Sequence, residues 1–228
     1  MKSKTNKKAA SLLTFLALFL HLTATAQDVE QQLGEFSEIK TFNAVEVEVI
    51  PSSENRIVIT GHSKHDVKFE IVKDRLEVRL SLDNLWSKDN TRITLYTKDL
   101  ETIDANEGTF VVVRNRMQGE DLTFRAQEGA TIEAKVNGRK IYAKAISGGR
   151  ILLDGSAEEQ VVEINTGGHY YGKNLETERT EVTAGTMGKA EVLAKDYVKA
   201  TAKLGGTVEI FGNPAEVDTR TSLGGKIL

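Results

Sequence analysis

The feature that most constrains the fold is a glycine-containing step that recurs about every 19 residues through the second half of the chain. Seventeen of the 19 glycines lie at or after Gly108. We take the residue that follows each step as an anchor, and consecutive anchors are 18 to 21 residues apart. The anchors are Thr109, Ala130, Gly149, Gly168, Gly188, Gly206 and Gly225. A period of this length predicts a repeat architecture.

Apolar residues occupy fixed positions around each anchor. Two residues after it stand Val111, Ile132, Ile151, Tyr170, Ala190, Val208 and Ile227. Four residues before it stand Ala105, Ala126, Ala145, Ile164, Ala184, Ala202 and Thr221. The columns between them are mostly polar. Apolar and polar residues therefore alternate with the period of two expected of strands. Each repeat should therefore hold two short strands joined at a corner, where glycine supplies a positive φ.

These units predict an all-β fold, a parallel β-helix or solenoid with coils of about 19 residues. A β-sandwich with short strands would also fit the turn spacing. The apolar residues keep the same positions relative to the anchor in all the units, and this favours the solenoid. Within it, Tyr170 falls in an inward column, and the small Gly172 should make room for its ring.

Residues 36–107 contain strand patterns but almost no glycine. We expect this strand-rich segment to form irregular first coils that cap the N-terminal end, since an uncapped solenoid exposes a pairing edge. No linker-like stretch separates it from the repeats at 108–228. The prediction is one domain over residues 36–228, preceded by a short segment at 27–35.

The N-terminus has the pattern of an export signal. Four lysines precede an apolar run that ends at Ala24-Thr25-Ala26, a sequence typical of signal-peptidase sites. We predict that residues 1–26 are a cleaved signal peptide, because the apolar run is too short for a membrane span. No transmembrane anchor should then remain. With no cysteine near the cleavage site, lipid attachment is not expected.

The net charge limits the classes of partner, and the absence of cysteine limits the sources of stability. Cleavage would remove four lysines and no acids, taking the formal net charge from −3 to −7. An acidic chain argues against nucleic acid or an anionic membrane as the main partner, because both attract basic surfaces. The chain has no cysteine, so its stability must come from core burial rather than from disulfides.

Several of these features resemble a known family. They are the export signal, the opening Phe42-Asn-Ala-Val-Glu-Val-Glu-Val49, the strand pair ending in Leu76-Glu-Val, and Gly-Gly corners that finish in Gly205-Gly206-Thr-Val-Glu-Ile-Phe-Gly-Asn-Pro. They are similar to the putative autotransporter-adhesin head GIN domain family over about residues 36–228. The resemblance implies a right-handed β-helix from a Bacteroidetes-type bacterium, without an assigned biochemical function. It thus implies export to the periplasm or cell surface of a Gram-negative cell.

Motifs for catalysis are missing from the sequence: it has no nucleophile elbow, phosphate-binding loop or dinucleotide fingerprint. His62 and His65 flank Ser63 in a polar turn, where a metal site would still need further ligands beyond Asp66. We interpret this turn as a solvated loop. No catalytic residue, metal ligand or cofactor is predicted.

The candidates for surface binding lie in outward columns. Arg150, His169 and Lys189 share the column one residue after the anchor, and this basic row could contact an anionic glycan. The alternative is that Lys189 pairs with Glu191 or Glu209 on a solvated face. Tyr171 lies outward beside Leu152, a patch that would also suit an oligomer contact.

Trp86 is the last candidate, because an exposed indole in its polar stretch would suit stacking on a sugar or contact with a partner. Folding back over the end of the solenoid is the alternative.

Taken together, the sequence predicts an exported, non-enzymatic binding or structural module of the cell envelope, adhesin-like, with a glycan or an envelope protein as partner. A polysaccharide-active β-helix enzyme and a self-associating scaffold are the alternatives. The sequence ends at Leu228 within a repeat. We therefore expect the C-terminal edge to be paired or covered in a homo-oligomer.

Overall fold

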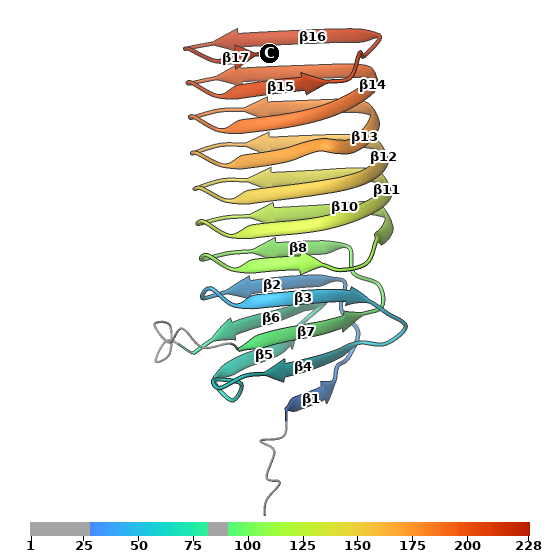
Figure 1. Ribbon diagram of the computed structural model, residues 1–228, viewed down its shortest axis with the longest axis vertical. Coiled ribbons are helices and arrows are strands. Elements are labelled where there is room, and N and C mark those ends of the chain that lie inside the picture. Colours follow the sequence, from blue (N-terminus) through green and yellow to red (C-terminus); the bar gives the residue numbers. More distant parts are fainter. Residues whose placement is uncertain (1–27, 82–90) are drawn as a thin grey trace, which may run out of the picture.

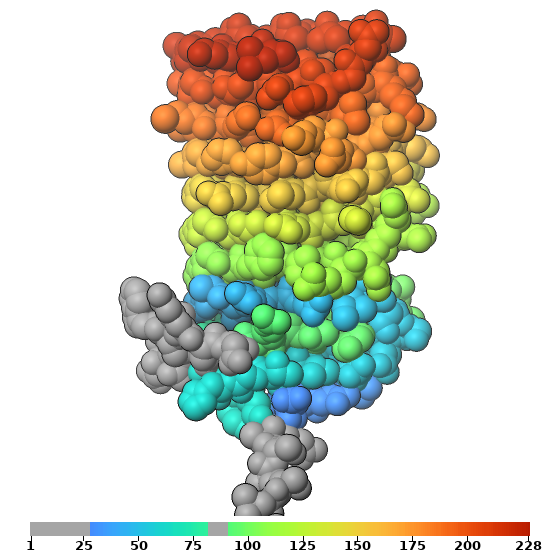
Figure 2. Space-filling model, in the orientation of Figure 1, coloured from blue at the N-terminus to red at the C-terminus, as the bar shows by residue number. Residues whose placement is uncertain are grey.

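A computed structural model describes residues 28–81 and 91–228. These residues form a rod of stacked coils, with the first strands at one end and the C-terminus at the other (Figure 1). The coils have closely similar outlines along the rod (Figure 2). The predicted all-β solenoid is confirmed, and the coils wind in the right-handed sense (Figure 1). The predicted signal peptide, residues 1–26, lies outside the described residues.

The described ranges contain seventeen strands and no helix long and apolar enough to cross a membrane. The strands are β1 (Val29–Gln32), β2 (Glu38–Phe42), β3 (Glu46–Pro51), β4 (Arg56–Thr60), β5 (Val67–Val72), β6 (Arg75–Leu80), β7 (Arg92–Thr97), β8 (Thr102–Ala105), β9 (Phe110–Val113), β10 (Met117–Ala126), β11 (Thr131–Ala145), β12 (Arg150–Ile164), β13 (His169–Ala184), β14 (Lys189–Lys203), β15 (Thr207–Phe211), β16 (Glu216–Ser222) and β17 (Lys226–Ile227).

Each regular coil contributes to two parallel sheets that face each other across a thin core. The front sheet, nearer the viewer in Figure 1, contains β7, β3, β9, the first halves of β11 to β14, β15 and β17. The back sheet contains β6, β2, β8, the second halves of β10 to β14, and β16. At one side of the rod, β11 to β14 bend from the front sheet to the back sheet without a break.

At the other side, a tight two-residue turn returns the chain from the back sheet to the front sheet. In one such turn, Ser147 and Gly148 have φ values of 51° and 76°, and the Gly149 amide donates to the Ile146 carbonyl at 2.9 Å. Two consecutive positive φ values with this hydrogen bond define a type I′ turn. The turns are joined along the rod, because the Gly148 amide also donates to the Thr166 carbonyl of the next coil at 3.1 Å.

The two glycines of a Gly-Gly corner serve different needs, a positive φ at the first and close packing of backbones at the second. Only Gly148 lies in the left-handed region. A Cβ on Gly149 would instead lie 2.1 Å from the carbonyl oxygen of Ala126 in the preceding coil. The second glycine is required because two backbones approach each other too closely for any side chain.

The columns predicted to face inward are buried. Val111, Ile132 and Ile151 of the front sheet and Ala105 and Ala126 of the back sheet are each 0% exposed. Burial of these aliphatic and alanine columns is the main source of stability in a chain without disulfides.

Tyr170 interrupts the aliphatic columns with a buried polar group. Its ring lies over Gly172, where an added Cβ would be 2.3 Å from the ring carbon Cε1, as the sequence predicted. Its hydroxyl donates to Gln160 Oε1 at 2.8 Å, and Gln160 Nε2 donates to Thr180 Oγ1 at 2.9 Å. Complete burial raises the pKa of the Tyr170 hydroxyl. The polar atoms of this cluster are thus paired within the core, as burial requires.

The N-terminal cap, β1 to β7, is not stacked in the order of the chain. β2 pairs with β6 on one side and β8 on the other, and β3 likewise lies between β7 and β9. β4 then runs antiparallel to β7, β1 antiparallel to β4, and β5 antiparallel to β6. The expected irregular first coils are therefore interleaved, and antiparallel strands close the end of the rod (Figure 1).

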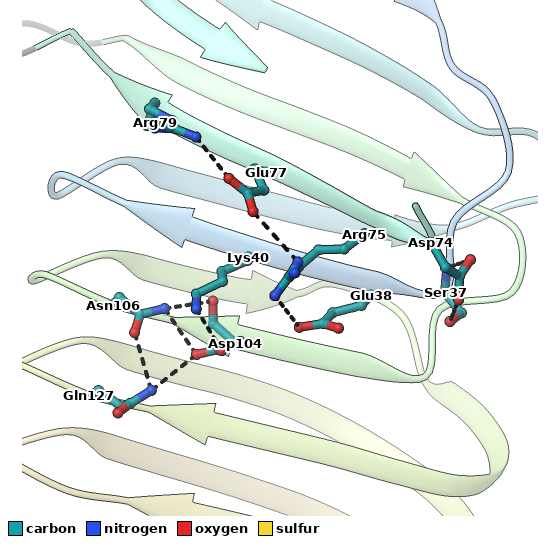
Figure 3. Close-up of polar contacts among 10 residues, drawn as sticks. All are labelled: Ser37, Glu38, Lys40, Asp74, Arg75, Glu77, Arg79, Asp104, Asn106 and Gln127. Atoms are coloured by element: carbon teal, nitrogen blue, oxygen red, sulfur yellow. Dashed lines mark hydrogen bonds and ion pairs between the residues drawn. The ribbon is translucent and has the colours of Figure 1, made fainter. Parts of the chain in front are cut away.

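Charged side chains on the back sheet match this interleaved order (Figure 3). Arg75 of β6 lies 3.7 Å from Glu38 of β2 and 3.6 Å from Glu77 on its own strand. On the other side of β2, Lys40 lies 3.6 Å from Asp104 of β8. Partly exposed ion pairs contribute little to stability. Here the ion pairs favour β6 on one side of β2 and β8 on the other, and so they help to specify which strands pair.

A polar row continues from these pairs into the regular coils (Figure 3). Asn106 Nδ2 donates to Asp104 Oδ1 at 2.9 Å, and Gln127 Nε2 of the next coil donates to Asn106 Oδ1 at 3.2 Å. The side chains that lead into the first tight turns are thus joined from coil to coil.

Candidate functional site

The outward face of the front sheet brings the predicted basic row together. Arg150, His169 and Lys189 are consecutive partners in the register of β12, β13 and β14. Adjacent parallel strands are about 4.8 Å apart, so the three side chains form one continuous row along the rod. The sequence columns therefore located neighbouring residues correctly.

Tyr171 belongs to the adjacent outward row and packs against the basic row. Its ring is stacked on that of His169, with centroids 6.0 Å apart and planes inclined by 11°. Leu152 of β12 is its register partner. His169 Nδ1 is buried and has no hydrogen-bond partner among the described residues. The two rings and the leucine give the face an aromatic and apolar surface.

Lys189 differs from the other members of the basic row because it is already paired. Its ammonium group lies 3.0 Å from Glu191 and 3.8 Å from Glu209. The hydrogen bond that Lys189 donates to the Glu191 carboxylate raises the pKa of Lys189. This is the solvated-face alternative considered for this residue, and it leaves Lys189 less available to an anionic ligand than Arg150.

A groove of about 620 Å³ follows the rod axis on this same face, and we call it the axial groove. It crosses β9, β11, β12 and β13 beside the bend. Its lining is Val112, Val113, Arg114, Glu133, Ala134, Lys135, Leu152, Leu153, Asp154, Tyr171, Lys173 and Asn174. A lining that combines apolar side chains with several polar groups is the usual composition of a ligand site.

Charged side chains in the middle of the groove are unpaired. Lys135 and Asp154 are register partners on β11 and β12, yet the described residues give neither an ion pair. Glu133, Lys173 and the nearby Arg150 likewise have no ion pair within residues 28–81 and 91–228. The free charges carry both signs, so they can donate to and accept from a polar ligand.

Ion pairs do occur at the two ends of the same face. Arg114 pairs with Glu48 at the N-terminal end of the groove. The pairs of Lys189 lie beyond its C-terminal end. The unpaired charges are therefore concentrated over β11 to β13, beside Tyr171 and Leu152.

A β-bulge shapes the C-terminal end of the axial groove. The register between β12 and β13 shifts after Leu152 and resumes at Asp154, whose partner is Asn174. Gly172 and Lys173 therefore lie opposite the single residue Leu153, and both Lys173 and Asn174 line the groove. Bulges commonly redirect side chains at binding sites. Lys135, Asp154 and Lys173 each stand five residues after their anchors, one position beyond the columns compared in the sequence, so a longer series of columns would have found this cluster.

The remaining sequence candidates contribute no further site. His62 and His65 are exposed in the turn after β4. The described residues hold no group of three or more side chains suited to a metal ion. Trp86 lies outside the described residues, so its predicted stacking role stays a prediction.

Comparisons with known proteins agree with this architecture. The model of the family described as putative auto-transporter adhesin, head GIN domain, matches residues 35–214. A crystal structure of a putative adhesin from Bacteroides fragilis NCTC 9343 superposes with a TM-score of 0.79 at 15% identity, covering 88% of this chain and 94% of that one. Another, of a putative adhesin from Parabacteroides merdae ATCC 43184, gives 0.68 at 18% identity, with 89% and 95% covered. No curated protein matches the chain.

Proposed function

This chain belongs to the family of putative auto-transporter adhesin head GIN domains, and on that premise we propose that it is an exported, non-enzymatic module that binds an extended carbohydrate chain in its axial groove. The family supports an adhesin-like role at a surface. This chain shares its rod fold with the two solved putative adhesins described above. The groove supplies the chemistry that a surface glycan would need.

The observation that carries the proposal is the coincidence of unpaired charges and stacked rings in one groove. Sugars present apolar C–H faces together with hydroxyl groups. Tyr171 and Leu152 offer a flat apolar surface, while Lys135 and Asp154 offer a donor and an acceptor beside it. Arg150, next to His169, would add a charge-assisted contact to a carboxylate or sulfate on the glycan.

The groove has the shape of a polymer site rather than of a small-molecule pocket. It extends over four successive coils, β9 to β13, and therefore over about 14 Å of the rod axis. A chain lying along the axis would meet a new pair of side chains at every coil. Several weak contacts then add up, as in binding that depends on repeated units.

A glycan-binding screen on residues 27–228 tests the proposal. We expect the wild type to bind a subset of glycans, and Tyr171→Ala and Arg150→Ala to weaken that binding about tenfold, the loss typical of a contact residue. Lys189→Ala should weaken it less, because this lysine is paired with Glu191. The matched control is Lys199→Ala, an ion-paired lysine on the back sheet. Absence of glycan binding, or equal losses in the control, would contradict the proposal.

The two alternatives have distinct readouts in the same experiment. Glu133 and Asp154 both line the groove, so shortening of a bound polysaccharide would support the enzyme instead. Concentration-dependent oligomers that disappear in Tyr171→Ala would support the self-associating scaffold through the Leu152–Tyr171 patch.

A further inference from the structure

A second surface feature lies on the edge formed by the tight turns, away from the axial groove. Met187, Leu204 and Leu223 occupy the tips of three successive turns and are 76%, 48% and 75% exposed. We call these three residues the apolar ridge. Earlier turns on the same edge present polar or acidic residues at their tips. These are Glu107, Glu128, Ser147 and Thr166.

The turn geometry does not explain the apolar residues. Met187, Leu204 and Leu223 have φ values of 61°, 51° and 47°. The left-handed region disfavours residues other than glycine, asparagine and aspartate. The side chains are also too exposed to contribute to the core. Neither local conformation nor packing therefore favours leucine or methionine at these positions.

The three residues form a continuous strip along the rod. The Met187 amide donates to the Leu204 carbonyl at 3.0 Å, and the Gly205 amide donates to the Leu223 carbonyl at 3.1 Å. A Cβ on Gly205 would lie 3.7 Å from Met187 Cγ, so the methionine side chain leans over the next turn. The turns that contain Met187 and Leu204 each have a neighbouring turn on both sides. These two side chains therefore stay exposed even where the coils are fully stacked.

Two exposed lysines flank the apolar ridge. Lys203 immediately precedes Leu204, and its stem passes over the preceding coil, 3.5 Å from the position of a Cβ on Gly185. Lys226 follows the turn that contains Leu223. Neither lysine has an ion pair within the described ranges, whereas Lys189 nearby is paired with Glu191. The ridge is thus an apolar strip beside free ammonium groups.

We propose that the apolar ridge docks the rod edge-on onto a phospholipid surface. Protruding apolar side chains enter the boundary between head groups and acyl chains, and adjacent lysines contact the phosphates. A second copy of this chain fits less well, because a stable interface buries about 800 Å² per partner and three side chains on a convex edge are too few. The axial groove lies beside the opposite bend, so it would remain open to a glycan.

Vesicle co-sedimentation of residues 27–228 tests this proposal. We expect binding to vesicles of phosphatidylethanolamine and phosphatidylglycerol, and weaker binding to phosphatidylcholine alone, because the lysines favour anionic head groups. The variant carrying Met187→Gly, Leu204→Asn and Leu223→Asn should lose about tenfold in vesicle binding. Glycine and asparagine suit the left-handed turn, so this variant should fold at least as well as the wild type.

Matched controls separate lipid docking from other causes. Glu107→Asn with Glu128→Asn changes, in two earlier coils, the turn position that Leu204 and Leu223 occupy, and it should leave vesicle binding unchanged. Lys203→Gln with Lys226→Gln should remove the preference for phosphatidylglycerol.

Wild type that stays in the supernatant, or a triple variant that still sediments, would overturn the proposal. Oligomers that the triple variant abolishes would point instead to contact between copies. Glycan binding by the triple variant should be normal, so the two proposals stand or fall separately.

Discussion

The cap and the regular coils enclose the same kind of aliphatic interior but hold their backbones together by different means. In the coils, each strand pairs with the strand one period away, and every tight turn donates to the next. In the cap, β2 and β3 are inserted between strands that come later in the chain. The coils thus derive their order from repetition, whereas the cap needs particular side chains to specify each neighbour.

The tight turns show the difference most directly. Among its described residues, the cap has one such turn between the back and front sheets, at Asn43-Ala44, with φ values of 61° and 53° and no glycine. The Ala44 amide donates to the Glu107 carbonyl at 2.9 Å, so this turn begins the same ladder. At the position equivalent to Gly149, the cap holds the buried Val45. The cap, like the first two regular coils with Thr109 and Ala130, leaves room for a side chain where the later coils bring two backbones together.

The largest expected effect is therefore a side chain at the second glycine of a coil. Gly149→Ala would force a Cβ to within 2.1 Å of the Ala126 carbonyl oxygen, and both atoms belong to backbone. We expect a loss of more than about 3 kcal/mol in the free energy of unfolding, above the usual cost of overpacking.

Gly148→Ala in the same turn is the control. Its Cβ would have no contact closer than 4.0 Å, and only its φ of 76° opposes a side chain. A loss of about 1–2 kcal/mol is expected there. Urea unfolding of both variants measures the difference, and equal losses would refute the separate roles of the two glycines.

In the cap, the position most sensitive to substitution is a buried side chain, that of Asn55. Asn55 is 7% exposed; its Nδ2 donates to the Gly34 carbonyl at 3.1 Å and its Oδ1 accepts from the Lys98 amide at 2.9 Å. Asn55→Ala should cost about 2 kcal/mol, because it leaves buried backbone groups unpaired. Asn165→Ala removes a bond only to the exposed Thr166 amide next to it and should cost less. Equal thermal shifts in the two variants would contradict this contrast.

A smaller effect of opposite sign is expected at the turn of the cap. Ala44→Gly should relieve the positive φ, while glycine adds conformational entropy to the unfolded chain. The balance predicts a stabilisation of about 0.5–1 kcal/mol. Met187→Gly makes the same change in a regular coil and should stabilise by a similar amount. Calorimetry showing a lower melting temperature for Ala44→Gly would disprove the argument.

The smallest effect concerns alkaline pH in the coils. Burial raises the pKa of Tyr142 on the back sheet from 10.0 to about 12. The folded state therefore favours the neutral phenol. This contribution is complete below pH 10 and is lost as the pH rises toward 12. Unfolding compared at about pH 9 and about pH 11.5 should show this decline, and it should be shallower in Tyr142→Phe. Identical slopes for the two proteins would rule the assignment out.

Much of the coil region could be predicted from the sequence because each column repeats a local environment. The anchors located the turns, the inward columns and the neighbouring residues Arg150, His169 and Lys189. The Asn43-Ala44 turn was missed because no glycine marks it. The groove residues Lys135, Asp154 and Lys173 were missed because they share the column five residues after the anchor, one position beyond the columns compared.

The sequence by itself determined the period, the inward faces and the family, since a repeat reports the same contact many times. Only the tertiary structure decided which charges remain free. Lys189 and Lys135 look alike in the sequence, yet Lys189 forms ion pairs with two carboxylates while Lys135 forms none with the residues that the structure describes. The interleaving of β2 and β3 was likewise decided in three dimensions, because pairing between distant, non-repeating strands depends on which side chains meet once the chain has folded.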